Sequence, residues 1–287
     1  MHRARLADGT DVAVKIQYPE ARRLFPGDLA SLRRAARAVR FLRRGLDLRT
    51  LVDELAAFVA LELDFAREAR STLRARAELS TRTDVVVPKV HEALSTDRLL
   101  VLELLEGAPL TDLERVRAVE PDLRRLAERV ASVYCAMIFE HGFFHGDPHP
   151  GNILARADGR IALLDFGLAK ELPAGFGAGV ASMLAGAMMG QPERTVAAAR
   201  SIGFVIREGD PAALVALIRA LLGQYAPDRG LFDLLQGGVV ESVPPHFALV
   251  VRALILLNGL SHRLVPGQRI IAMAVGAQVS RLVAAGA

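Results

Sequence analysis

The sequence contains one cysteine and only three lysines in 287 residues. A lone Cys135 cannot form an internal disulfide, which excludes a disulfide-stapled scaffold and favours a reducing compartment. It stands in the apolar run 133–138, where a buried, inert thiol is expected. Arginine greatly outnumbers lysine, a bias typical of a GC-rich bacterial genome. Because a guanidinium does not replace a compact ammonium, the lysines to interpret first are Lys15, Lys89 and Lys170.

Aromatic residues are also scarce, at 5% of the chain, and they do not alternate with basic residues. The pI is near 9.7 but the net charge is only +4, so no nucleic-acid partner is expected. Arg3 and Arg5 precede no apolar core, and no signal peptide is predicted. The most apolar C-terminal stretch, 247–260, contains Arg252 and is expected to be too short to span a bilayer. The predicted localisation is cytoplasmic.

The pattern of apolar residues predicts an α+β protein with two lobes. Hydrophobic residues make up 52% of the chain, which indicates a folded protein with a sizeable core. Strands are predicted at 3–7, 11–17, 85–90, 98–103, 152–155 and 161–164, and helices at 28–45, 48–79 (broken in the middle) and 119–141. We expect a small strand-containing lobe at 1–105, with inserted helices at about 20–50. A mostly helical lobe at 106–287 would carry the segments described next.

Two short segments carry the most informative polar residues. Asp147 and Asn152 lie in the segment 145–152, and Asp165 lies in the segment 164–167. Two carboxylates and an amide supply the oxygen ligands that Mg²⁺ prefers. In this arrangement Asp147 is left to accept a hydroxyl proton or to orient a water molecule. The spacing is that of a kinase catalytic loop followed by a metal-binding Asp-Phe-Gly.

Lys15 occupies an alternating strand pattern at 12–16. A lysine that points from a strand into a cleft can hold nucleotide phosphates, provided that a carboxylate from a helix fixes it. The helical segment 62–69 offers Glu62, Asp64 and Glu68, of which only some can point into a cleft. The sequence alone does not decide which carboxylate meets the lysine.

Each of these residues has a plainer interpretation that remains open. Lys15 alone would be a surface lysine, and the carboxylates of 62–68 would form a solvated helix face. Three histidines spaced by four residues, from His141 to His149, would suit a zinc site on a helix, but two prolines in that segment disfavour a helix.

Taken together, four segments resemble the UbiB-type, AarF-like family of atypical protein-kinase-like proteins. They are VAVKIQYP at 12–19, ELDFAREA at 62–69, HGDPHPGN at 145–152 and LDFG at 164–167. The resemblance covers nearly all of the first 175 residues and continues more weakly through 252–259. It implies a protein-kinase-like bilobal fold, with antiparallel strands and inserted helices in a small N-lobe and a large helical C-lobe.

The resemblance also implies roles and cofactors. Lys15 would bind the phosphates of ATP, paired with Glu68 of the helix that corresponds to the kinase C helix. Asp147 would be the catalytic-loop aspartate, with Asn152 and Asp165 as ligands of Mg²⁺.

Further implied roles concern the segments around the nucleotide. Glu103 and Leu105 would form the hinge that meets adenine through backbone groups. Glu62 and Asp64 match a Glu-x-Asp motif of the family, which in relatives faces an N-terminal Lys-x-Gly-Gln segment. Neither that segment nor the family's alanine-rich nucleotide loop precedes His2 in this sequence, which favours a truncated copy or a late start codon.

The function implied is that of a Mg-ATP-dependent atypical kinase or ATPase, with a role in isoprenoid-quinone or membrane-lipid metabolism. The alternatives are a weak pseudokinase that acts as a nucleotide-binding scaffold or regulator, and a small-molecule phosphotransferase. An arginine-rich face of the helix at 28–45 predicts peripheral contact with anionic membrane or lipid, with a solvated face as the alternative. That face consists of Arg33, Arg37, Arg40 and Arg44.

Overall fold

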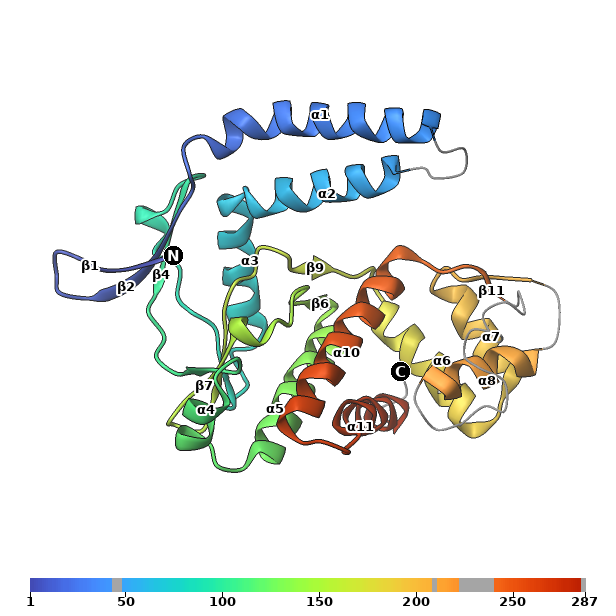
Figure 1. Cartoon of the computed structure of the whole chain (residues 1–287). Helices are drawn as coiled ribbons and strands as arrows, with labels where there is room; N and C mark the ends of the chain where they lie inside the picture. The colour runs from blue at the N-terminus through green and yellow to red at the C-terminus, as the bar shows by residue number, and fades with distance from the viewer. Residues whose placement is uncertain (43–47, 208–210, 222–239, 285–287) are drawn as a thin grey trace. The chain divides into compact units, whose positions relative to one another are not determined.

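The computed structural model describes residues 1–42, 48–207, 211–221 and 240–284 (Figure 1). The chain divides into two compact units. The first unit contains Met1–Glu106 together with Ala162–Ala169, and the second contains Gly107–Ile161 together with Lys170–Ala287. The segment that carries Asp165, which the sequence assigned to the second lobe, therefore belongs to the first unit. Small antiparallel sheets among many helices confirm the α+β class.

A three-stranded antiparallel sheet organises the first unit. Its strands are β1 (His2–Arg5), β2 (Asp11–Ile16) and β4 (Leu99–Glu103), with β2 in the centre. Gly9, at φ +90°, lies in the turn of the predicted hairpin, where a residue without Cβ adopts this conformation at no steric cost. The unit also contains β3 (Val85–Val86) and a 3₁₀ turn, η1 (Glu92–Leu94).

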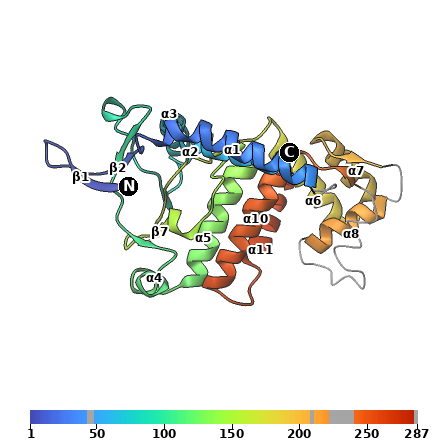
Figure 2. The ribbon, with the colours of Figure 1, turned by 45° about the horizontal axis from the view of Figure 1, so that its top comes forward.

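Three helices stand between β2 and β3. They are α1 (Ala21–Leu42), α2 (Arg49–Glu62) and α3 (Phe65–Glu78). The first two pack against each other in both views, and Arg33 of α1 forms an ion pair of 2.7 Å with Asp53 of α2 (Figures 1 and 2). One arginine of the proposed membrane face is therefore engaged within the unit.

The structure differs from the predicted start of the first helix and confirms the predicted break in the second. Helix α1 begins at Ala21, before the predicted start at 28, and continues through Pro26. The predicted break within 48–79 is confirmed, because α2 ends and α3 begins on either side of Leu63 and Asp64. Arg44 lies outside the described residues, and so does the predicted end of the first helix at 45.

The second unit is mostly helical. Its described helices are α4 (Leu113–Val119), α5 (Leu123–Ala136), α6 (Phe176–Met189), α7 (Pro192–Ser201), α8 (Pro211–Leu221), α10 (Pro245–Leu264) and α11 (Ile270–Ala284). Helices α5 and α10 lie side by side (Figures 1 and 2). Helix α5 continues as a π-helical turn, η2 (Met137–His141), which ends at Gly142 with φ +61°. The fully buried side chains of Tyr134 and Met183 belong to the core of this unit.

Short strand pairs flank the loop at 145–152 in the second unit. Strand β6 (Phe143–Phe144) pairs with β9 (Lys170–Glu171), and β5 (Ala108–Pro109) pairs with β7 (Ile153–Ala155). The loop between β6 and β7 holds residues 145–152 and ends in the 3₁₀ turn η3. The remaining elements are η3 (Pro150–Asn152), β8 (Ile161–Leu163), β10 (Val205–Ile206) and β11 (Val240–Ser242).

The expectation that the apolar stretch at 247–260 is too short to cross a bilayer is wrong as to length. It forms α10, a helix of 20 residues that is long and apolar enough for a membrane span by length and composition. About a third of its apolar window is buried, and the helix packs on α5 and α11. The helix extends beyond the apolar run at both ends.

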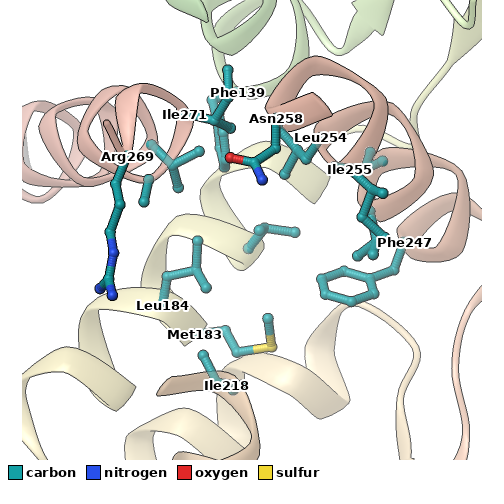
Figure 3. A pocket seen from close by; sticks show the side chains of 15 residues that line it. Phe139, Met183, Leu184, Ile218, Phe247, Leu254, Ile255, Asn258, Arg269 and Ile271 are labelled. Atoms are coloured by element: carbon teal, nitrogen blue, oxygen red, sulfur yellow. The ribbon is translucent and has the colours of Figure 1, made fainter. Parts of the chain in front are cut away.

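An apolar cavity of about 360 Å³ lies among the helices of the second unit (Figure 3). Helices α6, α8, α10 and α11 line it, together with Phe139 of η2. Asn258 and Arg269 are the polar side chains among the described lining residues, and none of these residues carries a carboxylate. The described lining therefore offers no carboxylate that could bind a metal ion or accept a proton.

Cys135 is buried in α5, with 2% of its surface exposed, as the sequence predicts. Burial raises the pKa of its thiol to about 12. The nucleophilic thiolate is therefore almost absent from the folded protein at pH 8. We expect a thiol reagent such as dithionitrobenzoate to leave the native protein unlabelled at pH 8 and to label the protein fully in denaturant.

The same raised pKa determines how the contribution of Cys135 to stability depends on pH. The unfolded chain loses the thiol proton near pH 9, and the folded chain only near pH 12, so Cys135 contributes less to stability as the pH rises from 9 to 12.

In the labelling experiment, native protein that reacts at pH 8 as fast as a small-molecule thiol would contradict the burial of Cys135.

Candidate nucleotide and metal site

Lys15 lies on the side of β2 that faces helix α3. Side chains alternate along a strand, so Ala13, Lys15 and Gln17 share this side. Ala13 is buried in a cluster with residues of β4, and Phe65 and Ala69 of α3 pack against that cluster. The Gln17 amide donates a hydrogen bond of 2.9 Å to the backbone carbonyl of Leu63, just before α3. The sequence pattern thus turns Lys15 toward the helix.

Helix α3 presents Glu68 to this lysine. Asp64 begins the helix, since its side chain accepts a hydrogen bond of 2.8 Å from the backbone N–H of Arg67. Phe65, Ala69 and Leu73 recur at helical spacing and pack on the sheet, which places Glu68 beside the same face. Glu68 is only 3% exposed.

Lys15 forms two ion pairs in the first unit. Its Nζ lies 2.5 Å from Oε1 of Glu68 and 2.8 Å from Oδ2 of Asp165. The side chains of Lys15 and Glu68 are 14% and 5% exposed, whereas that of Asp165 is 31% exposed. The three charged groups predicted to serve the nucleotide phosphates and the metal are therefore in contact. Of the three carboxylates in 62–69, the one that meets Lys15 is Glu68.

Burial and charge act in opposite directions on this cluster. Burial raises the pKa of Glu68 to about 7, while the nearby Lys15 opposes that rise. Burial by itself lowers the pKa of Lys15, but the attraction of Glu68 and Asp165 outweighs it, so that pKa lies above its ordinary value. Lys15 is therefore fully charged near neutral pH, and the ionised form of Glu68 depends on it.

The backbone around Asp165 has a special conformation. Asp165 is the one non-glycine residue with positive φ, at +61°, among the residues that the structure describes. Such a conformation is uncommon for a residue with a Cβ and occurs where the surroundings enforce it. Two residues later, a Cβ on Gly167 would lie 3.3 Å from Oδ1 of Asp165 and 3.5 Å from Oε2 of Glu68. Gly167 therefore leaves room for both carboxylates.

Arg67 holds the segment after Asp165. Its Nη1 donates a hydrogen bond of 2.5 Å to the carbonyl of Gly167, and its Nη2 donates one of 2.7 Å to the carbonyl of Ala169. The sequence analysis missed this residue. Its position in the motif at 62–69, next to Glu68, is the only signal that pointed to it.

The predicted catalytic loop, residues 145–152, forms a second group of contacts, within the second unit. The side-chain amide of Asn152 donates a hydrogen bond of 3.1 Å to Oδ2 of Asp147. The backbone N–H of Asp147 donates to Nδ1 of His145, which is 1% exposed and packs edge-on against Tyr134. The Nδ1 atom of His149 accepts a hydrogen bond from the N–H of Gly151. The Asn152 bond holds the amide against the Asp147 carboxylate, and His145 holds the backbone of Asp147, a contact that the sequence did not predict.

Each unit contains a side chain with an oxygen donor of the kind that Mg²⁺ prefers. Asp165 provides a carboxylate and Asn152 an amide oxygen, since the amide nitrogen of Asn152 is used on Asp147. Within the described residues, no group of three or more His, Cys, Asp or Glu side chains gathers as a metal site, which leaves the zinc alternative without support.

The other predicted residues lie around these groups. Glu62 is the last residue of α2. The backbone N–H of Glu103 donates to the carbonyl of Lys89, and its carboxylate accepts from the N–H of Lys89. Leu105, half-buried, lies two residues beyond β4. A hinge role for Glu103 and Leu105 stays a prediction.

Comparison with known proteins decides the family. The profile of the ABC1 atypical kinase-like domain matches residues 1–199. The chain belongs to this family. This match confirms the family resemblance found in the four sequence segments. The matched region ends within α7.

Several ABC1-family relatives are similar over long stretches. The chain is 30% identical over 287 residues to the uncharacterized protein slr1919 of Synechocystis, covering 96% of this chain and 51% of that protein. It is 35% identical over 181 residues to AarF domain-containing protein kinase 1 of Xenopus tropicalis, covering 61% and 35% of the two chains. The chain thus spans about half or less of the length of these relatives.

A solved structure shows the same fold. It is the complex of Rv3197 with erythromycin from Mycobacterium tuberculosis, with a TM-score of 0.74 and 22% sequence identity. The similarity covers 98% of this chain and 73% of that one. The kinase-like α+β fold expected for an ABC1-family chain is therefore confirmed.

Proposed function

We propose that the protein binds ATP with Mg²⁺ and catalyses phosphoryl transfer, either to an acceptor hydroxyl or to water. The observation that carries the proposal is the contact of Lys15 with both Glu68 and Asp165. A buried lysine held between two carboxylates is the group that kinase-like proteins place on nucleotide phosphates. Membership in the ABC1 atypical kinase-like family supports the same reading.

Each residue of the site has its own proposed role in binding or catalysis. Lys15 binds phosphate oxygens and offsets their charge, and Glu68 orients the lysine. Asp165 and Asn152 are the proposed metal ligands, and bound Mg²⁺ would neutralise charge on the transferred group. Asp147 accepts the proton of the attacking hydroxyl or water at its carboxylate, which the Asn152 amide orients by its hydrogen bond.

The test is ADP formation from ATP in the presence of Mg²⁺. We expect wild-type protein to form ADP and Asp147→Asn to lose about 100-fold or more in rate, because a proton acceptor typically contributes 10²–10⁴-fold. Glu114→Gln is the matched control, since Glu114 is an exposed carboxylate in the first turn of α4 in the same unit. Equal rates for the wild type and Asp147→Asn would sink the catalytic role.

Two alternatives are distinguished when nucleotide binding and phosphorylation of small alcohols are measured beside ADP formation. Nucleotide binding without any turnover, even with lipid or phenolic activators, would support a pseudokinase that acts as a scaffold or regulator. Rapid phosphorylation of a small polar alcohol would support a small-molecule phosphotransferase. A role in isoprenoid-quinone or membrane-lipid metabolism stays a prediction, because no observation of the chain identifies the acceptor.

Contact with an anionic membrane also stays a prediction. Arg37 is exposed on α1, as the prediction requires, whereas Arg33 is paired with Asp53. A solvated face with one internal ion pair accounts equally well for this arrangement.

A further inference from the structure

We propose that Arg67 is a positioning residue that clamps the segment Asp165–Ala169 and so keeps Asp165 in its binding conformation. The inference rests on the proposed function in one respect, since it takes Asp165 to be a metal ligand. The clamp itself is a property of the first unit alone, because Arg67, Asp165 and Ala169 all belong to that unit.

The clamp consists of two hydrogen bonds from one guanidinium. Nη1 reaches the carbonyl of Gly167 at 2.5 Å and Nη2 reaches that of Ala169 at 2.7 Å. The two carbonyls are two residues apart, so the planar fork spans the backbone directly after the metal-binding aspartate. Hydrogen bonds from a charged donor are shorter and stronger than neutral ones. A lysine does not reproduce this geometry, because its three N–H donors share one nitrogen, whereas the guanidinium presents two nitrogens side by side.

The backbone of Arg67 is itself held in place. The backbone N–H of Arg67 donates to the side chain of Asp64, which caps the first turn of α3. The next residue, Glu68, forms the ion pair with Lys15. One helical turn thus holds both partners of the cluster: Glu68 binds the lysine, and Arg67 binds the segment that carries Asp165.

The clamped segment needs such support. Asp165 has a φ of +61°, which a side-chain-bearing residue rarely adopts unless its surroundings enforce it. Gly167 has no side chain and lies close to Glu68 and Asp165, so it provides no side-chain contact that could hold the turn. The Lys15–Asp165 ion pair, at 2.8 Å, requires this backbone to remain in place.

The test compares Arg67→Met and Arg67→Lys with Arg70→Met. Arg70 is an exposed arginine on the same helix and serves as the matched control. The first readout is backbone hydrogen exchange in the peptide that contains 165–169, measured on the ligand-free protein. We expect exchange to rise at least about tenfold in both Arg67 variants, the factor that corresponds to one lost charge-assisted hydrogen bond, and to stay unchanged in Arg70→Met.

The second readout is nucleotide binding with and without Mg²⁺. In Arg67→Met we expect the metal concentration for half-saturation to rise about tenfold, as for a residue that orients a metal ligand. The affinity for metal-free ATP, which depends on Lys15, should change less than about twofold. Arg67→Lys should not rescue the metal dependence.

Each outcome is decisive for the clamp. Unchanged exchange at 165–169 in Arg67→Met would overturn it, as would a uniform rise in exchange over the whole first unit, which indicates a general loss of folding. Equal losses of metal-dependent and metal-free nucleotide affinity would also overturn it. If wild-type protein shows no metal dependence at all, the proposed function fails, while the exchange measurement still decides whether Arg67 holds the segment.

Discussion

Asp165→Asn is expected to weaken Mg²⁺-dependent nucleotide binding by at least about 100-fold, since even a residue that merely orients a metal ligand is worth 10–100-fold. The substitution keeps the size of the side chain and removes its negative charge. Two partners are affected, because the carboxylate both pairs with Lys15 at 2.8 Å and is the proposed metal ligand. The measurement is the nucleotide dissociation constant with and without Mg²⁺.

A matched carboxylate separates this effect from a general change of charge. Asp84 belongs to the same unit and pairs with Arg82 at 2.6 Å, away from any residue to which we assign a role. Asp84→Asn should bind the Mg²⁺-nucleotide like the wild type. Identical Mg²⁺ dependence in Asp165→Asn and Asp84→Asn would show that Asp165 is not a metal ligand.

Lys15→Met is the second substitution with a large expected effect. It should lower nucleotide affinity or turnover by about 10²–10³-fold, the usual cost of removing a group aimed at developing charge. Lys15→Arg should not restore the function, because a planar guanidinium differs in shape from the ammonium that fits between Glu68 and Asp165. The assay is ADP formation at saturating and subsaturating ATP.

Lys15→Met should also affect folding in a defined way. Breaking a buried ion pair usually costs about 3–5 kcal/mol, because one charge is left buried without its partner. Burial already raises the pKa of Glu68 to about 7, so without Lys15 this carboxyl takes up a proton at neutral pH. We therefore expect a loss of about 3 kcal/mol or less in the free energy of unfolding, measured by urea denaturation.

Lys89→Met is the control for this substitution. Lys89 is an exposed lysine of the same unit, and its side chain has no assigned role. It should retain both activity and stability. Full activity in Lys15→Met would remove the lysine from the proposed site.

The sequence predicted the parts of the fold that depend on local periodicity. Alternation in 11–17 with a turn at Gly9 gave the hairpin, and helical spacing in 48–79 gave two helices with a break. The start of α1 at Ala21 was missed because Pro26 marks a helix end in most sequences, although it lies inside this helix. The length of α10 was missed because residues at both of its ends are less apolar than 247–260.

The sequence also predicted only part of the candidate site. Residue types and spacing singled out Lys15, Asp147, Asn152 and Asp165, since each belongs to a short motif. Spacing could not decide which carboxylate of α3 meets Lys15, because that depends on how the helix packs on the sheet. Nor could it find the contacts of Arg67 with two backbone carbonyls, about 100 residues away in sequence. Surface arginines are so common in this chain that only its position among the motif residues distinguishes Arg67.

The sequence also did not predict that Asp64 caps α3. The motif Glu-x-Asp was interpreted from the family as a contact for a segment outside this sequence. Within the chain, the side chain of Asp64 caps α3, and the same turn bears Arg67 and Glu68. One short motif thus sets the position of the whole cluster.

Isothermal titration of ATP into the wild-type protein, with Mg²⁺ and then with EDTA, tests the central claim most directly. Proteins commonly hold Mg²⁺ through one or two carboxylates together with substrate phosphates, so metal and nucleotide are expected to bind together. We predict clear binding with Mg²⁺ and a loss of affinity of at least about tenfold in EDTA, with Asp165→Asn insensitive to the metal. No binding in either condition, or equal affinity with and without Mg²⁺ in the wild type, would contradict the account.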